Sequence, residues 1–87
     1  MQDLQSLRQA LSALDDRLLE LVAERQRIVA EIGRVKSQAG KATRDYNRER
    51  QVLELARRSA RRAGIEESLA EDIFRLLIRA SLALQEQ

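Results

Sequence analysis

Apolar side chains recur every seven residues along the first part of the chain, in two interleaved series. This spacing is typical of a helix that packs one apolar stripe against a second helix. The 87 residues contain three glycines and no proline, so no proline ring interrupts the pattern. We therefore expect one continuous helix from Leu4 to Ser37, followed by a loop around Gly40. The two series are Leu4, Leu11, Leu18, Arg25 and Ile32, and Leu7, Leu14, Leu21, Ile28 and Val35.

Two shorter apolar stripes follow, and each predicts a further helix. The second helix is expected to begin at Thr43 or Asp45, either of which suits the N-cap, and to end at Ala63. Gly64 then fits the left-handed position that commonly ends a helix. The third helix is expected over residues 66–86. The predicted stripes are Val52, Leu53, Ala56, Ala60 and Ala63, and Leu69, Ile73, Leu76, Leu77, Ala80 and Leu84.

The length of the first helix suggests how the chain assembles. Thirty-four residues of helix extend ~51 Å, whereas a compact 87-residue globule has a radius of gyration of only ~12 Å. We therefore expect an all-α fold with one very long and two shorter helices per chain, forming an intertwined helical homodimer. Residues 1–87 would form a single domain. The alternative is a first helix that breaks at Gly33 or near Arg25, which would give a four-helix monomer.

The missing residue types limit the chemistry within these 87 residues. Cysteine and histidine are both absent, which removes thiol nucleophiles, disulfides, imidazole proton transfer and the usual zinc sites. We therefore expect no metal site and, if the chain is an enzyme, a reaction that needs little proton transfer and no covalent intermediate. Electrostatic stabilisation by lysine and arginine is the main catalytic tool that is left.

Charge and hydropathy narrow the choice of partners. The 16 basic side chains are nearly balanced by 14 acidic ones, and only 2% of the residues are aromatic. Nucleic-acid binding proteins usually show a larger basic excess or stacking aromatic residues, so no nucleic-acid site is expected. No apolar run approaches the ~20 residues of a membrane span, and residues 1–3 lack the basic leader of a signal peptide. We expect a soluble cytoplasmic protein.

Arg25 is the one charged residue in the seven-residue series. A buried guanidinium needs an anion, because burying an unpaired charge is costly. That anion could be Glu24, Glu49 or an acid of a partner chain, or it could be a bound ligand, and the pattern leaves both hypotheses open. Lys36 lies eleven residues later, close to three full turns, and so shares the face of Arg25 at a distance of ~16 Å. The two cations could converge on one small anion.

Further polar residues lie at positions where an anionic ligand could meet them. Arg8 is seventeen residues before Arg25, ~25 Å along the helix, so only an antiparallel partner chain could bring it to the same ligand. From the pattern alone, Arg8 is interpreted as a flanking surface charge. Arg48 and Glu49 are expected in the first turn of the second helix, where free backbone N–H groups attract anions. Ser81 and Gln85 form an i, i+4 polar pair on the third helix. A basic strip is interpreted as a solvated face: Arg57, Arg58, Arg61 and Arg62.

Several short motifs match a known family in both order and spacing. The first helix carries Leu7-Arg8, Leu14-Asp15, Leu18-Leu19-Glu20-Leu21, Ala23-Glu24-Arg25 and Ile32-Gly33-Arg34-Val35-Lys36. Arg44-Asp45 with Arg48-Glu49 opens the second helix, and Gly64-Ile65, Ile73-Phe74, Ile78, Ser81 and Gln85 mark the third. Together these motifs resemble the all-helical chorismate mutases over essentially the whole chain. Each motif is weak by itself, and the set with its spacings is specific.

The resemblance implies a function, a site and an assembly. It implies isomerisation of chorismate to prephenate, on the route to phenylalanine and tyrosine, by an intramolecular [3,3] Claisen rearrangement without a cofactor. It also implies a homodimer whose two active sites are shared between chains. The implied catalytic residues are Arg25, Lys36, Glu49 and Gln85, and the implied substrate-binding residues are these four with Asp45, Arg48, Ser81 and Arg8 of the partner subunit.

Two other functions stay open from the sequence. Isochorismate-pyruvate lyases share the fold of this family and much of its cationic site, so the resemblance also extends to them. The Arg44–Glu49 segment favours the mutase. A non-catalytic helical interaction module would also explain the apolar stripe and the basic strip. Arg25 within the apolar series counts against that hypothesis. The length fits the mutase module alone, whether it is a separate chain or one domain of a fused protein.

Overall fold

A computed structural model describes residues 3–42 and 44–85, and the described part of the chain is entirely helical apart from its connections. The prediction of an all-α fold with one very long and two shorter helices is confirmed. Thr43 and the predicted end at residue 86 lie outside the described residues. The three helices are α1 (Leu4–Gln38), α2 (Tyr46–Ala63) and α3 (Glu67–Gln85).

Local signals set the helix boundaries much as the sequence predicts. Asp45 is the N-cap of α2, and its carboxylate accepts a hydrogen bond from the Arg48 backbone N–H at 3.0 Å. At the other end of α2, Gly64 has a φ of 75°, and the Ile65 N–H donates to the Ala60 carbonyl at 3.0 Å. This is the hydrogen-bonding pattern of a left-handed glycine end, which frees the chain to reverse direction.

The helix α1 is continuous through Gly33 and Arg25, so the four-helix alternative is wrong. It begins at the N-cap Asp3, whose carboxylate accepts a hydrogen bond from the Ser6 backbone N–H at 2.8 Å. This interaction with Ser6 lowers the pKa of Asp3 from its ordinary value. A capped start and an uninterrupted hydrogen-bond ladder keep the helix intact over its full length.

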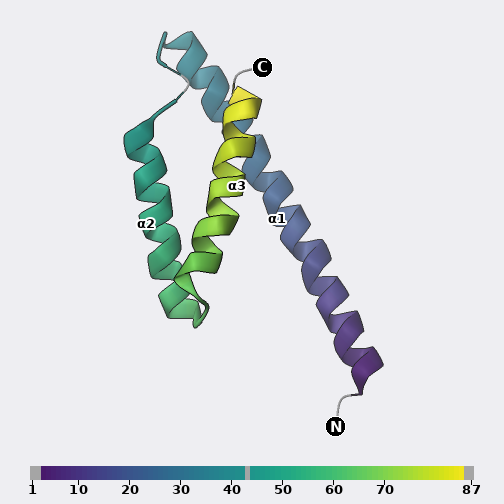
Figure 1. Ribbon diagram of the computed structural model, residues 1–87. Coiled ribbons are helices and arrows are strands. Elements are labelled where there is room, and N and C mark those ends of the chain that lie inside the picture. Colours follow the sequence, from purple (N-terminus) through teal and green to yellow (C-terminus); the bar gives the residue numbers. More distant parts are fainter. Residues whose placement is uncertain (1–2, 43, 86–87) are drawn as a thin grey trace.

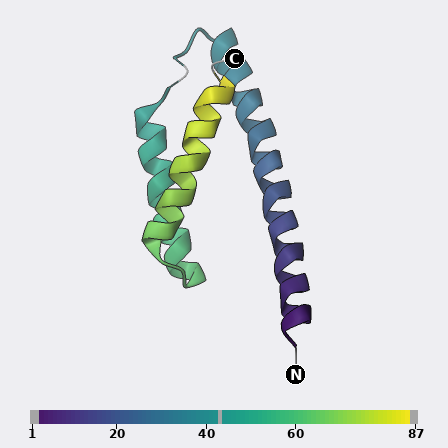
Figure 2. The ribbon, with the colours of Figure 1, turned by 45° about the vertical axis from the view of Figure 1, so that its right-hand side comes forward.

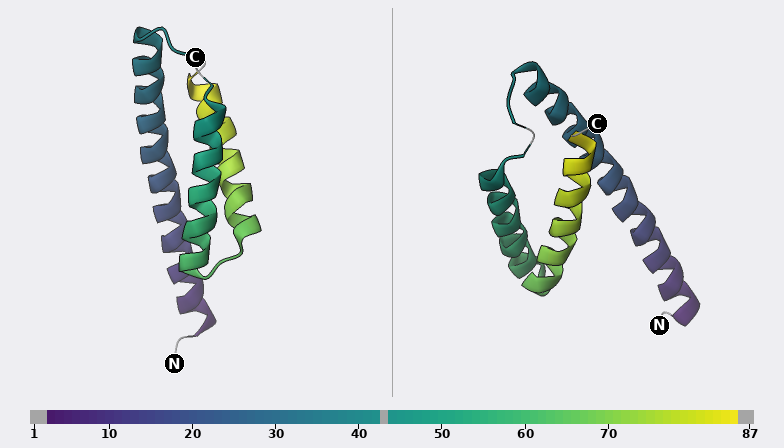
Figure 3. Two further views of the ribbon diagram at one scale, coloured as in Figure 1. Left: turned by 90° about the vertical axis from the view of Figure 1, so that its left-hand side faces the viewer. Right: turned by 45° about the horizontal axis from the view of Figure 1, so that its top comes forward.

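The hairpin of α2 and α3 packs on only one part of α1. α3 lies between the other two helices and contacts both of them (Figure 1). The N-terminal half of α1, drawn in purple, runs away from the hairpin (Figure 2; Figure 3, right). The radius of gyration is therefore 16.3 Å, against about 12 Å for a compact chain of this length. None of the described helices has both the length and the apolar character that a membrane crossing requires.

The core between α2 and α3 is built from small side chains. Ala56, Ala60 and Ala70 are buried, and Phe74 packs against them. Alanines at the contact let the two helix backbones approach closely. The predicted stripe of α2 is partly confirmed, since Val52, Leu53, Ala56 and Ala60 are buried or half-buried. The stripe of α3 is predicted to be buried. In the single chain this prediction is wrong for Leu69, Ile73 and Leu76, which are exposed.

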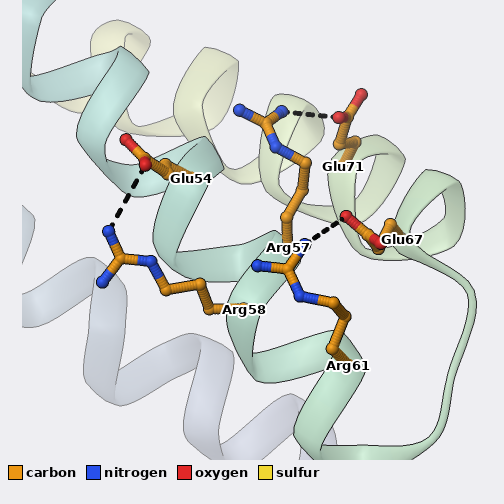
Figure 4. Close-up of polar contacts among 6 residues, drawn as sticks. All are labelled: Glu54, Arg57, Arg58, Arg61, Glu67 and Glu71. Carbon is orange, nitrogen blue, oxygen red and sulfur yellow. Dashed lines mark hydrogen bonds and ion pairs between the residues drawn. The ribbon is translucent and has the colours of Figure 1, made fainter.

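The basic strip of α2 is not simply a solvated face. Arg57 pairs with Glu71 of α3 at 2.5 Å, and Arg61 pairs with Glu67 of α3 at 2.9 Å (Figure 4). Arg58 instead pairs along its own helix with Glu54, at 3.3 Å. Two arginines of the strip therefore connect the helices of the hairpin, which the sequence interpretation missed.

The nine apolar residues of the seven-residue series are all exposed in the single chain, by 43% to 62%. The face of α1 that contacts α3 overlaps this series only in part, and on that face Val29 is the buried residue, at 7% exposure. Arg25 is half-buried and precedes Val29 by one turn, so it belongs to the face toward α3. Contiguous exposed apolar surface of this extent usually marks an interaction site.

Candidate active site

All three helices contribute to one cavity of about 230 Å³ beside the C-terminal half of α1. α1 and α3 supply its long walls, and the first turns of α2 close a third side. Its apolar lining consists of Val29, Ile32, Val52, Ile78 and Leu82. Its polar lining consists of Arg25, Lys36, Asp45, Arg48, Glu49, Ser81 and Gln85.

The polar lining contains seven of the eight residues that the sequence marks as a site. The eighth, Arg8, is not among the lining residues. It lies on the N-terminal half of α1, ~25 Å from Arg25 by the rise of the helix. One chain therefore brings together every predicted site residue except the one that was assigned to a partner chain.

Arg25 is held by two neutral groups of α3. Its Nη1 donates a hydrogen bond to the Ser81 hydroxyl at 2.7 Å, and that hydroxyl donates to the Leu77 carbonyl at 2.7 Å. Its Cζ lies 6.0 Å from the centre of the Phe74 ring. Burial lowers the pKa of Arg25, and the neighbouring charge of Arg48 lowers it further. An arginine keeps its charge under such conditions, so the site presents a partly desolvated cation.

The hypothesis of an ion pair with Glu24 or Glu49 is not supported. Within the described ranges, the partners of Arg25 are a hydroxyl and an aromatic ring, and neither is an anion. Glu49 pairs instead with Arg44, through two hydrogen bonds. A ligand or an acid of another chain remains to satisfy the charge of Arg25.

Lys36 and Gln85 meet at the end of the cavity. The Lys36 Nζ lies 3.5 Å from the Gln85 Oε1, and both side chains are half-buried. An amide that accepts through its oxygen still has two N–H donors for another acceptor. The pair can therefore present a positive charge and a hydrogen-bond donor to a single oxygen atom.

Gly33 lets α3 approach α1 at this point, a role that sequence reasoning missed. A Cβ at position 33 would lie 3.3 Å from the Gln85 Cγ and 3.4 Å from its Cα. A glycine inside a helix costs about 1 kcal/mol relative to alanine. This unfavourable glycine was the signal in the sequence that could have revealed the role, because a glycine in mid-helix often marks a close packing contact.

Replacing Gly33 by leucine is expected to lower kcat/KM about tenfold or more, because the larger side chain pushes the end of α3 away and separates Gln85 from Lys36. Steady-state kinetics on the purified variant would measure this loss. Gly33→Ala is the matched comparison, since its Cβ requires Gln85 to move by only about a few tenths of an ångström, and a much smaller loss is expected. Unchanged kcat/KM in Gly33→Leu would show that the close contact does not position Gln85.

The cavity carries a positive balance. Three cations, Arg25, Lys36 and Arg48, face two acids, Asp45 and Glu49. The Asp45 carboxylate is engaged in capping α2, and Glu49 is paired with an arginine outside the cavity. Apolar walls lower the local dielectric constant and strengthen the field of the remaining cations. No group of three or more acidic side chains in the described part of the chain is placed to hold a metal ion.

The fold and the cavity together define an all-helical protein with a cationic pocket suited to a small organic anion. A family model described as chorismate mutase type II matches residues 7–86. The chain belongs to this family, and the resemblance drawn from its motifs is confirmed.

Curated relatives are similar over the same length. A T-protein of Haemophilus influenzae is 37% identical over all of this chain, which spans 23% of that protein. A chorismate mutase of Methanocaldococcus jannaschii is 28% identical over all of this chain and 88% of its own length. A bifunctional chorismate mutase/prephenate dehydratase of Escherichia coli is 34% identical over 93% of this chain and 21% of its own length. The chain thus spans about a fifth to a quarter of the larger relatives.

Proposed function

We propose that this domain isomerises chorismate to prephenate. The observation that carries the proposal is the gathering of seven expected site residues, from three helices, around one cationic cavity in a chain of the chorismate mutase type II family. A further support is that two relatives carry chorismate mutase in their names.

The proposed reaction suits the side chains of this cavity. In a [3,3] rearrangement one C–O bond breaks while one C–C bond forms, so the substrate isomerises without gaining or losing an atom. The enzyme must hold a dianion in its reactive conformer and stabilise negative charge on the ether oxygen as that bond breaks. Positioning and fixed positive charge can supply both effects without a nucleophile.

Each polar residue of the cavity has a proposed part in this reaction. Arg25, braced by Ser81, binds a substrate carboxylate. Lys36 and Gln85 converge on the ether oxygen, where the ammonium group offsets the developing charge. The remaining residues orient the substrate: Arg48 toward a carboxylate, Glu49 toward the ring hydroxyl, and Asp45 beside Glu49 through its backbone.

We further propose that two chains assemble into an intertwined homodimer in which Arg8 of the partner subunit completes each site. The occupant of the exposed apolar series is a second copy of the same series, because nine apolar residues repeat along one helix with coiled-coil spacing. An antiparallel arrangement of the two α1 helices would carry Arg8 of one chain toward the cavity of the other.

The dimer can be tested without reference to activity. Because folding would be coupled to association, the melting temperature of the wild-type chain is expected to rise with protein concentration. Leu14→Glu places a charge in the apolar series and is expected to shift sedimentation toward the monomer. Gln9→Glu, outside both series on the same helix, is the control. A wild-type chain that sediments as a helical monomer at all concentrations would contradict the proposal.

A spectrophotometric assay of chorismate consumption by the purified chain tests the proposed reaction directly. Loss of chorismate with formation of prephenate is the expected result. A parallel incubation with isochorismate separates the alternatives, since release of salicylate and pyruvate in its place would identify a lyase. No turnover of either compound would favour the interaction module.

A further inference from the structure

Arg44 makes a two-point contact with the cavity although it does not line the cavity itself. Its Nε lies 2.9 Å from the Glu49 Oε2, and its Nη2 lies 3.1 Å from the Glu49 Oε1. Glu49 belongs to the cavity wall and its side chain is 20% exposed, whereas that of Arg44 is 48% exposed. The ion pair therefore runs from the outer surface to the site. Such bidentate pairs are among the stronger and more directional contacts in proteins.

Tyr46 holds the other side of the same guanidinium. The Arg44 Cζ lies 4.4 Å from the centre of the Tyr46 ring, which is within the range of a cation–π contact. Tyr46 is the first residue of α2, and Arg44 directly precedes the N-cap Asp45. Arg44 therefore bends over the first turn of the helix, stacks on the ring and reaches Glu49. A guanidinium fixed on both sides imposes one orientation on the carboxylate that it binds.

The pair also changes what Glu49 presents to a ligand. An unpaired carboxylate in the wall would repel a dianion by Coulomb's law, and the wall is apolar enough to strengthen that repulsion. Arg44 offsets this charge while occupying one lone pair on each oxygen. Each carboxylate oxygen has about two acceptor sites, so one on each is left for a hydroxyl donor.

We propose that Arg44 is a positioning residue, which orients the Glu49 carboxylate toward the hydroxyl of the bound substrate and offsets its charge, with Tyr46 as the platform that fixes the guanidinium. The assignment rests on the proposed function, because it is the substrate hydroxyl that Glu49 would meet. Lysine cannot replace arginine fully here, since an ammonium group has neither the planar fork nor the stacking face.

Kinetics of four variants and one control variant test this role. Arg44→Gln is expected to lower kcat/KM about tenfold or more, and Arg44→Lys is expected to recover only part of it. Glu49→Gln and the Arg44→Gln/Glu49→Gln double variant complete a mutant cycle. If Arg44 acts through Glu49, the double variant loses no more than Glu49→Gln alone. Arg58→Gln is the matched control, because Arg58 also pairs with a glutamate of α2 but lies outside the cavity lining.

Two kinetic outcomes would overturn the assignment while leaving the proposed function intact. One is an active Arg44→Gln variant within twofold of the Arg58→Gln control. The other is a double variant whose loss equals the product of the two single losses, because Arg44 would then act independently of Glu49.

Fluorescence provides a readout that does not depend on turnover. Tyr46 is the only tyrosine and the chain has no tryptophan, so tyrosine emission reports this one ring. Arg44→Gln should change that emission, and Glu49→Gln should change it too, because the guanidinium loses its second anchor. An inactive wild-type chain would overturn the proposed reaction, whereas the emission tests the Tyr46–Arg44–Glu49 contact separately. Unchanged tyrosine emission in Glu49→Gln would overturn the assignment of Arg44 as the residue that links Tyr46 to Glu49.

Discussion

Replacing Lys36 by alanine is expected to lower kcat for prephenate formation by about 10²- to 10³-fold, which corresponds to about 3–4 kcal/mol of transition-state stabilisation. The Lys36 ammonium group is half-buried and lies beside Gln85 in the cavity. It is proposed to offset the charge that develops on the ether oxygen as the C–O bond breaks. The interaction grows toward the transition state, so the loss should fall mainly on kcat, with a smaller change in KM.

The matched control for Lys36→Ala is Lys41→Ala. Lys41 follows α1 in an exposed connection and does not line the cavity. Its replacement should leave kcat and KM unchanged, which separates the loss of a specific cation from the loss of net charge. Circular dichroism would show that both variants keep their helices. A fall of less than tenfold in kcat for Lys36→Ala would contradict the proposed role of Lys36.

Mixing inactive Arg8→Ala chains with inactive Lys36→Ala chains is expected to restore activity. In a mixed dimer one site would combine the intact Lys36 of the first chain with the intact Arg8 of the second. The other site would carry both defects. Random pairing of equal amounts would make about half of the dimers mixed, so about a quarter of all sites would be intact. The measurement is prephenate formation after the chains have been unfolded and refolded together.

A second mixture supplies the control for this experiment. Arg25 and Lys36 line the cavity of the same chain. A mixture of Arg25→Ala and Lys36→Ala chains therefore leaves one defect in every site and should recover no activity. If chain exchange is shown by a mass tag and the Arg8→Ala mixture also stays inactive, the shared site is wrong.

The helix boundaries were predictable because the signals that set them are local. Asp45 caps α2 through a residue three positions later, and Gly64 ends the helix through its own backbone conformation. A capping side chain or a glycine end depends on neighbours within one turn of the chain. The length of α1 follows in the same way from its composition and from the absence of proline.

The role of Arg25 was only partly predictable. Its place in an apolar series indicated that it needs a special environment, but the pattern could not choose between an ion pair and a ligand. The structure brings α3 against Arg25, so that Ser81 and Phe74 hold the side chain and neither neutralises it. That choice depends on the rotation of two helices about their axes, which is set by packing between residues 56 positions apart.

The sequence by itself determined the three helices, the seven-residue repeat with its nine apolar residues along α1, and the identity of the polar residues that the family resemblance marks. Only the tertiary structure decided that α3 packs on the Arg25–Val29 face, that Gly33 makes room for Gln85, and that Arg44 binds Glu49. Helix formation and capping are local interactions, so they can be deduced from neighbouring residues. The faces that meet and the side chains that converge depend on the close packing of segments distant in the chain, which no local pattern specifies.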